Sequence, residues 1–302
     1  MALGIIFIAF ASIAFGIGPV ITKELIACGL DTIDIMLFPK ISMLLVAGAF
    51  LLVGRISLKI TKKQLWQLLL FSVCFNGITG LLLIQSYIYL PIGLATMFHF
   101  IYPVVVTFFM IVLYKEKASA LRVAAIILAL AGLCLILDLS GNMSLPGVAL
   151  ALGSGFAYAT YVIANRKSAY RNLPVLIVVF YSSLATFVIM ILIQLTRGRM
   201  IIPSTTHEWI LITANGLFSD LFAFFMLITG IRRIGASNGA LANMLEPITA
   251  LVAGAVVYGD RIELKAICGC IMVLLAITFI TINNNRLASG EENPEKRLKS
   301  EE

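Results

Sequence analysis

Charged residues are scarce in this chain of 302 residues. They make up 12% of it, against 61% hydrophobic residues, and the mean hydropathy is +1.04. A soluble domain carries about 25% charged residues, so the sequence lacks the polar surface that a water-soluble fold presents. At about 20 apolar residues per membrane crossing, about ten spans fit into one membrane domain.

The residues that carry chemistry are also few. The chain has two histidines, and its five cysteines include Cys74, Cys134, Cys268 and Cys270 within apolar runs, where thiols act as small packing groups. No cysteine spacing is typical of a metal site or a disulfide framework, and no glycine-rich phosphate loop is present. We therefore expect no enzymatic activity, no metal, no cofactor and no ATP hydrolysis by this chain.

The net charge of +7 does not indicate a nucleic-acid partner, because the basic residues are scattered through short polar segments without interleaved aromatics. No Lys or Arg precedes Lys23, so the first apolar run lacks the positive segment of a secretory signal and is interpreted as a retained span.

Ten continuous apolar runs follow one another, separated by short polar segments. They cover residues 3–22, 33–53, 65–89, 92–114, 120–137, 145–164, 175–195, 209–231, 236–258 and 266–282. Continuous runs of this length favour helices over a membrane β-barrel, which would show shorter alternating segments. The sequence therefore predicts an all-α integral membrane protein with ten transmembrane helices.

Basic residues predict the orientation. Most of the 22 Lys and Arg residues lie after the second, fourth, sixth, eighth and tenth runs. The positive-inside rule then places both termini in the cytoplasm of a cell-membrane protein. Residues 284–302 are polar, mixed in charge and contain Pro294, which predicts a disordered cytoplasmic tail.

The chain resembles itself at an offset of 143–144 residues. The only two tryptophans, Trp66 and Trp209, match at 143, and Pro103 matches Pro247 at 144. Each half holds five runs, and because five is odd, the second copy must cross the membrane in the opposite sense. We predict repeats over 1–142 and 143–283 with inverted topology, an arrangement typical of secondary transporters.

Several segments carry a resemblance to a known family. In the first half they are Gly93 to Met97, Tyr102-Pro103, Tyr114 to Glu116 and Gly132; in the second they are Gly235 to Ser237, Leu245 to Pro247 and Tyr258 to Asp260. With this order of helices they resemble the EamA family of the drug/metabolite transporter superfamily, over the whole chain except the tail. The resemblance implies a central cavity and the export or exchange of small metabolites such as amino acids. Lys40 departs from it, since many relatives have Arg there.

Two polar pairs mark the best candidate site. His99 and Tyr102 precede Pro103, and Asn243 and Glu246 precede Pro247 in the same relation. Residues three apart share a helix face, and the following proline frees a carbonyl one turn earlier. A polar and locally loosened point, present in both halves, is a candidate binding or gating site.

Two further ionisable residues lie within predicted spans. Glu246 lies near the middle of its run, where it could bind a proton or a substrate amine, or serve only in helix packing. Asp220 is also deep, and Lys40 is its expected partner, so the two form either part of the site or a structural ion pair. Lys40 could instead extend to the membrane surface.

The remaining candidates are polar, aromatic or helix-breaking. Asn76, Gln85 and Asn165 could line the cavity or join helices, and Tyr158 and Tyr161 could stack on a substrate or pack in the core. Gly16, Gly18 and Pro19 could form a hinge in the first span, although Gly and Pro are common in membrane helices.

The predicted function is a secondary transporter that exports or exchanges a small metabolite, with amino acids as the leading class and protons as the candidate coupling ion. The alternatives are a multidrug or organic-cation exporter and, from a different class, a passive channel or a membrane subunit without transport. The partners are then a small-molecule substrate and the bilayer, with the chain as a monomer or homodimer.

Overall fold

The computed structural model describes residues 2–90, 92–116, 120–136, 144–258 and 264–289, and within these residues the chain is helical without strands. This confirms the predicted all-α class. Helix is what the sequence requires, because a backbone in hydrocarbon must satisfy its own hydrogen bonds.

The elements up to residue 136 are named here in chain order. They are α1 (Ala2–Ala27), α2 (Thr32–Leu37), α3 (Pro39–Val53), α4 (Lys62–Leu69), η1 (Leu70–Gly77), α5 (Ile78–Ser86), α6 (Ile92–His99), α7 (Tyr102–Tyr114) and α8 (Ala120–Ile136).

The elements from residue 145 onward follow a similar order. They are α9 (Leu145–Lys167), η2 (Ala169–Asn172), α10 (Val175–Arg197), α11 (Thr206–Ala214), η3 (Asn215–Phe222), α12 (Ala223–Ile234), α13 (Ala236–Ala242), η4 (Asn243–Leu245), α14 (Glu246–Tyr258) and α15 (Leu264–Ser289). Helix α15 continues beyond the boundary predicted at residue 283, and the predicted tail from residue 290 lies outside the described residues.

Six helical stretches among the described residues are long and apolar enough to cross a membrane. They are Ala2–Ala27, Thr32–Val53, Leu145–Lys167, Val175–Arg197, Thr206–Ile234 and Ala236–Val257. Shorter apolar helices cover Tyr102–Tyr114, Val123–Leu135 and Ile267–Ala276. The structure thus gives six clear candidates for membrane crossing, and the count of ten stays a prediction.

The two halves share unusual local features. In each, a helix begins at a threonine capping box, Thr61 with Gln64 and Thr205 with Glu208, and leads into a π-helical segment, η1 or η3. In a capping box two side chains satisfy backbone N–H groups that the first helical turn leaves free. π-Helical segments are rare and often lie at functional sites.

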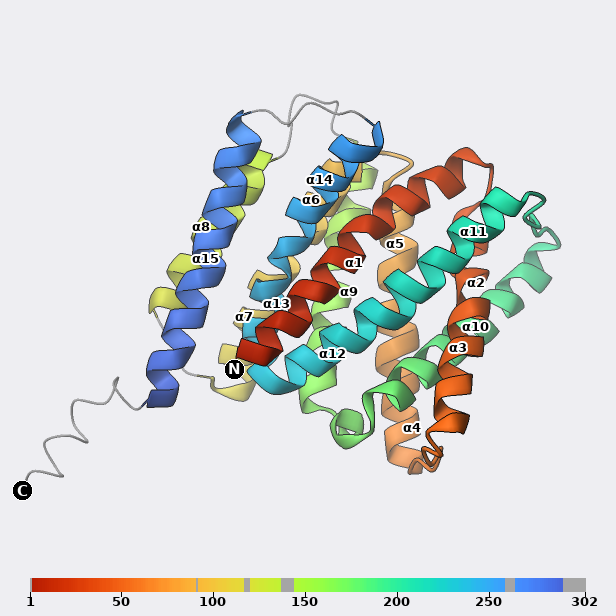
Figure 1. The fold of residues 1–302 in the computed structure, drawn as a ribbon, viewed down its shortest axis with the longest axis horizontal. Coiled ribbons are helices and arrows are strands. Elements are labelled where there is room, and N and C mark those ends of the chain that lie inside the picture. The colour runs from red at the N-terminus through yellow and green to blue at the C-terminus, as the bar shows by residue number, and fades with distance from the viewer. Residues whose placement is uncertain (1, 91, 117–119, 137–143, 259–263, 290–302) are drawn as a thin grey trace, which may run out of the picture.

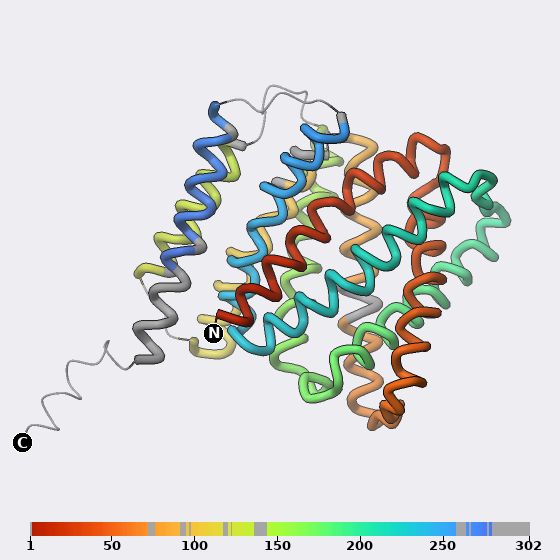
Figure 2. Tube along the Cα trace, in the orientation of Figure 1, coloured from red at the N-terminus to blue at the C-terminus, as the bar shows by residue number. Residues whose placement is uncertain are grey.

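The two halves are in extensive contact and do not form separate bodies. Helix α1 contacts α12 and α14, while α9 contacts α5 and α6, and Figure 2 shows α1 and α12 running alongside each other. Helices α8 and α15 pair at one edge of the bundle (Figure 1). Their approach is close, since a Cβ on Gly132 would lie 2.6 Å from the carbonyl oxygen of Gly269.

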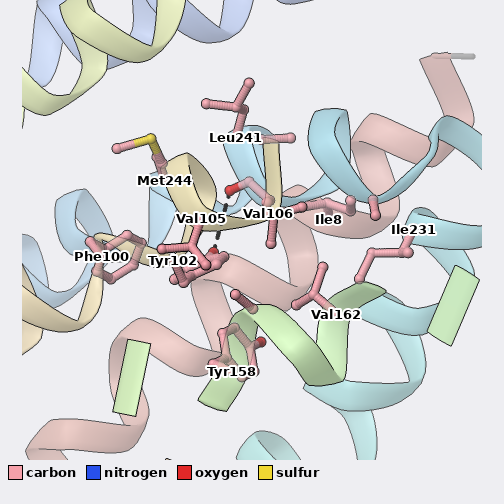
Figure 3. Close-up of a cluster of buried hydrophobic side chains, with 14 of the residues drawn as sticks. Ile8, Phe100, Tyr102, Val105, Val106, Tyr158, Val162, Ile231, Leu241 and Met244 are labelled. Atoms are coloured by element: carbon pink, nitrogen blue, oxygen red, sulfur yellow. Dashed lines mark hydrogen bonds between the residues drawn. The ribbon is translucent and has the colours of Figure 1, made fainter. Parts of the chain in front are cut away.

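The core lies where the two halves meet. Its largest cluster of buried side chains includes Ile8 of α1, Tyr102 and Val106 of α7, and Tyr158 of α9, with Ile231 of α12 on the same cluster (Figure 3). Because these residues come from both halves, the same packing that stabilises the bundle fixes the position of the polar groups beside it.

Candidate functional site

A cavity of about 200 Å³ lies at the centre of the bundle. Its charged and amide-bearing walls come from both halves: Lys40 and Asn76 from the first, and Asn215, Asp220 and Glu246 from the second. His99 also lines it. Asn76 lies in η1 and Asp220 in η3, so both π-helical segments bring a polar side chain to the cavity.

Lys40 and Asp220 form an ion pair across the cavity wall, with Nζ 2.5 Å from Oδ1. The side chains are only 12% and 16% exposed, so each charge depends on the other for compensation. The close packing of α3 on η3 permits this pair, because Gly216 has no side chain to hold the helices apart at Pro39. Lys40 therefore contacts Asp220, its expected partner, rather than extending away.

The helical path is broken between α13 and α14, where η4 lies, and this second helix break contains a hydrogen-bond network. The network is centred on Asn243, which is completely buried. The Asn243 amide nitrogen donates to the Tyr102 hydroxyl at 3.0 Å and to Glu246 Oε2 at 2.9 Å, and its oxygen accepts from Ser12 at 2.9 Å. The Tyr102 hydroxyl donates onward to the Ala240 carbonyl at 3.3 Å. This network joins α1, α7 and α14 and orients Glu246, which lines the cavity.

At the first break the chain leaves α6 after His99 and begins α7 at Tyr102. His99 is 5% exposed, and its Nδ1 lies 2.8 Å from Ser154 Oγ of α9. Its ring contacts those of Tyr102 and Tyr158, with centroids 5.5 and 5.3 Å away. His99 lines the cavity, whereas Tyr102 is buried and, among the described residues, is connected to Glu246 by hydrogen bonds through Asn243.

Aromatic rings form another part of the wall. Tyr158 and Tyr161 stack with centroids 6.1 Å apart, Tyr161 meets Phe224 edge to face, and Phe15 meets Phe224 in the same way. All four line the cavity. They present flat apolar surfaces beside the charged groups, which suits a small ligand with both polar and apolar parts.

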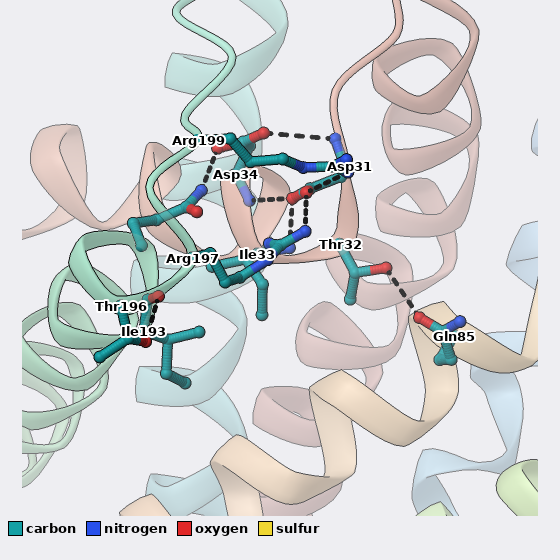
Figure 4. Close-up of polar contacts among 10 residues, drawn as sticks. Asp31, Thr32, Ile33, Asp34, Gln85, Ile193, Thr196, Arg197 and Arg199 are labelled. Carbon is teal, nitrogen blue, oxygen red and sulfur yellow. Dashed lines mark hydrogen bonds and ion pairs between the residues drawn. The ribbon is translucent and has the colours of Figure 1, made fainter.

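Two predicted lining residues lie elsewhere. Gln85 is on the other face of α5: its Oε1 accepts from Thr32 at 3.4 Å, and it lines a separate hollow with Leu81 and Arg197 (Figure 4). Asn165 is buried and donates to the Tyr161 carbonyl, a helix-internal contact one turn away. The residue type alone could not reveal which side of its helix each would face.

Two of the first-span candidates, Gly16 and Gly18, lie where α1 packs closely on the second half of the chain. A Cβ on Gly16 would lie 2.6 Å from Thr249 Cβ and 2.8 Å from the Glu246 carbonyl oxygen, so glycine lets α1 approach α14 beside the second break. Gly18 lies against Ser219. Helix α1 continues through Pro19 without interruption, and a hinge at Gly16, Gly18 and Pro19 stays a prediction.

Small hydroxyl residues and one amide, Asn215, also belong to the site, although they were not among the residues predicted from the sequence. Ser12 donates a hydrogen bond to Asn243. The cavity lining includes Thr22, Ser182, Ser183, Thr186 and Asn215. In a membrane helix such hydroxyls commonly bond to their own backbone, as Thr186 does to the Ser182 carbonyl at 3.0 Å. Their number in the apolar runs gives no signal of which ones face a cavity.

Comparisons with known proteins agree with this architecture. The profile of the EamA-like transporter family matches residues 2–138 and again residues 145–282. The chain is 25% identical over 232 residues to the threonine/homoserine exporter RhtA of Salmonella typhimurium (strain SL1344), covering 73% of this chain and 74% of that one.

Other relatives show a similar level of likeness. The RhtA protein of Escherichia coli (strain K12) is 24% identical over 78% of this chain and 79% of its own length. The uncharacterized transporter YvbV of Bacillus subtilis (strain 168) is 25% identical over 78% of this chain and 82% of its own. One crystal structure has the same fold, with a TM-score of 0.79 at 16% identity, over 95% of this chain and 99% of that one.

Proposed function

The chain belongs to the EamA-like transporter family and is a multi-pass membrane protein, and from that premise we propose that it exports or exchanges a small metabolite of the amino-acid class. The observation that carries the proposal is the central cavity, which both halves line and which holds Lys40, Asp220 and Glu246. Charged groups inside a membrane are costly and mark substrate or ion pathways.

The charges favour a zwitterionic substrate. Asp220 already compensates Lys40, while Glu246 accepts one hydrogen bond among the described residues, from Asn243. A substrate ammonium group can therefore bind Glu246, and a substrate carboxylate can share Lys40 with Asp220. The weak similarity to exporters named for threonine and homoserine supports the same class.

We propose ten spans arranged as two inverted repeats, over residues 1–142 and 143–283, with both termini in the cytoplasm. Support comes from the two matches to the family profile, from the capping boxes and π-helical segments at equivalent places, and from the helix breaks before Tyr102 and Glu246. Alternating access would follow from rocking of one repeat against the other around the cavity.

Proton coupling is part of the proposal. Two carboxylates of the described residues line the cavity, and Asp220 is paired with Lys40 whereas Glu246 has no paired cation. A proton and a substrate amine therefore compete for the Glu246 carboxylate. Gating at Pro103 and Pro247 fits this scheme, because Pro103 closely follows His99 and Pro247 directly follows Glu246, the residues proposed to contact the substrate.

The test is counterflow in proteoliposomes loaded with unlabelled L-threonine or L-homoserine. We expect the wild type to accumulate labelled substrate above its equilibrium level. Glu246→Gln should slow counterflow about 10- to 100-fold, the loss expected when a hydrogen bond to a charged group is removed, and abolish its pH dependence. Glu24→Gln, at the end of α1 and away from the cavity, is the matched control.

Each other outcome identifies an alternative. Equilibration without accumulation indicates a passive channel, and no flux of any solute indicates a membrane subunit without transport. Counterflow of a quaternary ammonium ion in place of either amino acid indicates an organic-cation exporter. Wild-type rates and an unchanged pH profile in Glu246→Gln would contradict the coupling role.

A further inference from the structure

The contact between His99 and Ser154 determines which nitrogen of the histidine carries hydrogen. Ser154 Oγ lies 2.6 Å from the Ala151 carbonyl oxygen, one turn earlier in α9, and donates its hydrogen there. A hydroxyl has one hydrogen, so at its second contact, 2.8 Å from His99 Nδ1, Ser154 must accept. His99 therefore carries its hydrogen on Nδ1.

In a neutral imidazole with hydrogen on Nδ1, the other ring nitrogen, Nε2, is an acceptor. The two nitrogens lie on different edges of the ring. Since Nδ1 is directed at α9 and His99 lines the cavity, the Nε2 edge is the one free to meet a ligand.

The surrounding groups hold the ring in this orientation. A Cβ on Gly155 would lie 2.5 Å from the His99 carbonyl oxygen, so α9 packs directly on the backbone at the break. The rings of Phe100, Tyr102 and Tyr158 lie around the imidazole at centroid distances of 5.9, 5.5 and 5.3 Å. A ring this confined presents a fixed acceptor rather than a mobile one.

We propose that His99 Nε2 accepts a hydrogen bond from a side-chain hydroxyl of the transported molecule, making His99 a specificity-determining residue. The inference rests on the proposed function, in which Glu246 takes the ammonium group. The substrate class becomes a hydroxyl-bearing amino acid, and a site built to bond a hydroxyl discriminates against an analogue that lacks it, because the buried acceptor is then left unpaired.

The first experiment compares L-threonine with L-valine, in which a methyl group replaces the hydroxyl, as competitors in the counterflow assay. We expect His99→Asn, which keeps a donor near Ser154 and removes the acceptor at Nε2, to lower the threonine-to-valine preference about tenfold. His99→Gln, whose amide oxygen can reach the Nε2 position, should keep part of the preference. His207→Gln, at the other and exposed histidine, is the matched control.

Ser154→Ala tests the tautomer through its partner. It removes the acceptor of Nδ1–H without touching the cavity side of the ring, so the preference should fall by less than in His99→Asn. An unchanged preference in both His99→Asn and Ser154→Ala, with threonine still transported, would overturn the proposal.

The second experiment needs no variant of His99 and no transport. The chain has two histidines, so ¹⁵N-histidine labelling gives the Nδ1 and Nε2 signals of two imidazoles, and His207→Gln assigns them. We expect an unprotonated Nε2 at His99 that shifts when L-threonine is added and not when L-valine is added. A hydrogen on Nε2 would contradict the inference even if threonine proves not to be the substrate, whereas loss of threonine counterflow with the expected tautomer would remove only the proposed function.

Discussion

Two polar clusters join the first half of the chain to the second, and they differ in how fully their charges are used. At one end of the bundle, Asp31 accepts hydrogen bonds from the backbone of Ile33 and Asp34 and from Arg197 and Arg199 (Figure 4). In the cavity, Glu246 accepts one within the described residues, from Asn243.

Exposure differs in the same direction. The cations differ most, since Arg197 and Arg199 are 32% and 66% exposed and Lys40 is 12% exposed. The carboxylates Asp31 and Asp220 are closer, at 19% and 16%. In the end cluster of Asp31, Arg197 and Arg199, the carboxylate accepts four hydrogen bonds and the arginines are partly exposed to solvent. This is expected for a structural contact between α2 and α10. The charges of the cavity cluster are more buried, and Glu246 leaves acceptor capacity unused among the described residues, as expected for a binding site. The number and location of unused donors and acceptors separate the two roles better than the residue types do.

The largest effect should come from Asp220→Asn. It leaves the Lys40 charge without its partner in a buried place, which costs about 3–5 kcal/mol. Thermal unfolding in detergent should show a strongly lowered midpoint. The double variant Lys40→Met with Asp220→Leu should recover stability, because neither charge remains, but not transport. Equal stability of Asp220→Asn and the wild type would show that the pair is no more costly to break than a surface one.

Asn243→Ala should have an intermediate effect. It leaves Ser12, Tyr102 and Glu246 without a shared partner, at about 1–3 kcal/mol. Transport should fall with the loss of Glu246 orientation, and the pH profile of counterflow should move with it. A variant that loses stability while keeping the wild-type pH profile would limit Asn243 to a packing role.

The smallest effect should come from Asp31→Asn. Asparagine can still cap α2, and an exposed ion pair contributes about 0–1 kcal/mol. We expect counterflow at the wild-type rate and a stability difference that disappears at high salt. A large loss of transport would show that the end cluster takes part in the transport cycle.

The same residue gives a pH prediction. Partial burial opposes its ionisation, but hydrogen bonds from Arg197, the Asp34 backbone and Arg199 lower the pKa of Asp31 from 3.8 to about 2. A lowered folded-state pKa means that the stabilisation is complete above pH 3.8 and is lost as pH falls through about 2. The stability difference between the wild type and Asp31→Asn should therefore shrink between pH 4 and pH 2, as measured by thermal unfolding.

Much of this organisation could be predicted from the sequence because membrane helices obey simple rules. The helical class and the pairing of Lys40 with Asp220 follow from long apolar runs and from the cost of an unpaired charge in them. The positions of the helix breaks follow from Pro103 and Pro247.

What could not be predicted depends on rotation of helices about their axes. Gln85 faces away from the cavity and Asn215 faces it, although both are amides in apolar segments. The π-helical segments change the residue count per turn within Leu70–Gly77 and Asn215–Phe222, which alters the facing of the residues beyond them. The tautomer of His99 depends on Ser154, 55 residues away in the chain.

The central claim is that the cavity between the two halves is where the substrate binds. Ser183, which lines it, can be replaced by Cys in a variant whose five native cysteines have been removed, and the rate of modification by a small methanethiosulfonate reagent measured. We predict that L-threonine slows this modification while leaving the modification of Cys substituted for the exposed Ser57 unaffected. Modification of Ser183→Cys at an unchanged rate, in protein that still transports threonine, would contradict the account.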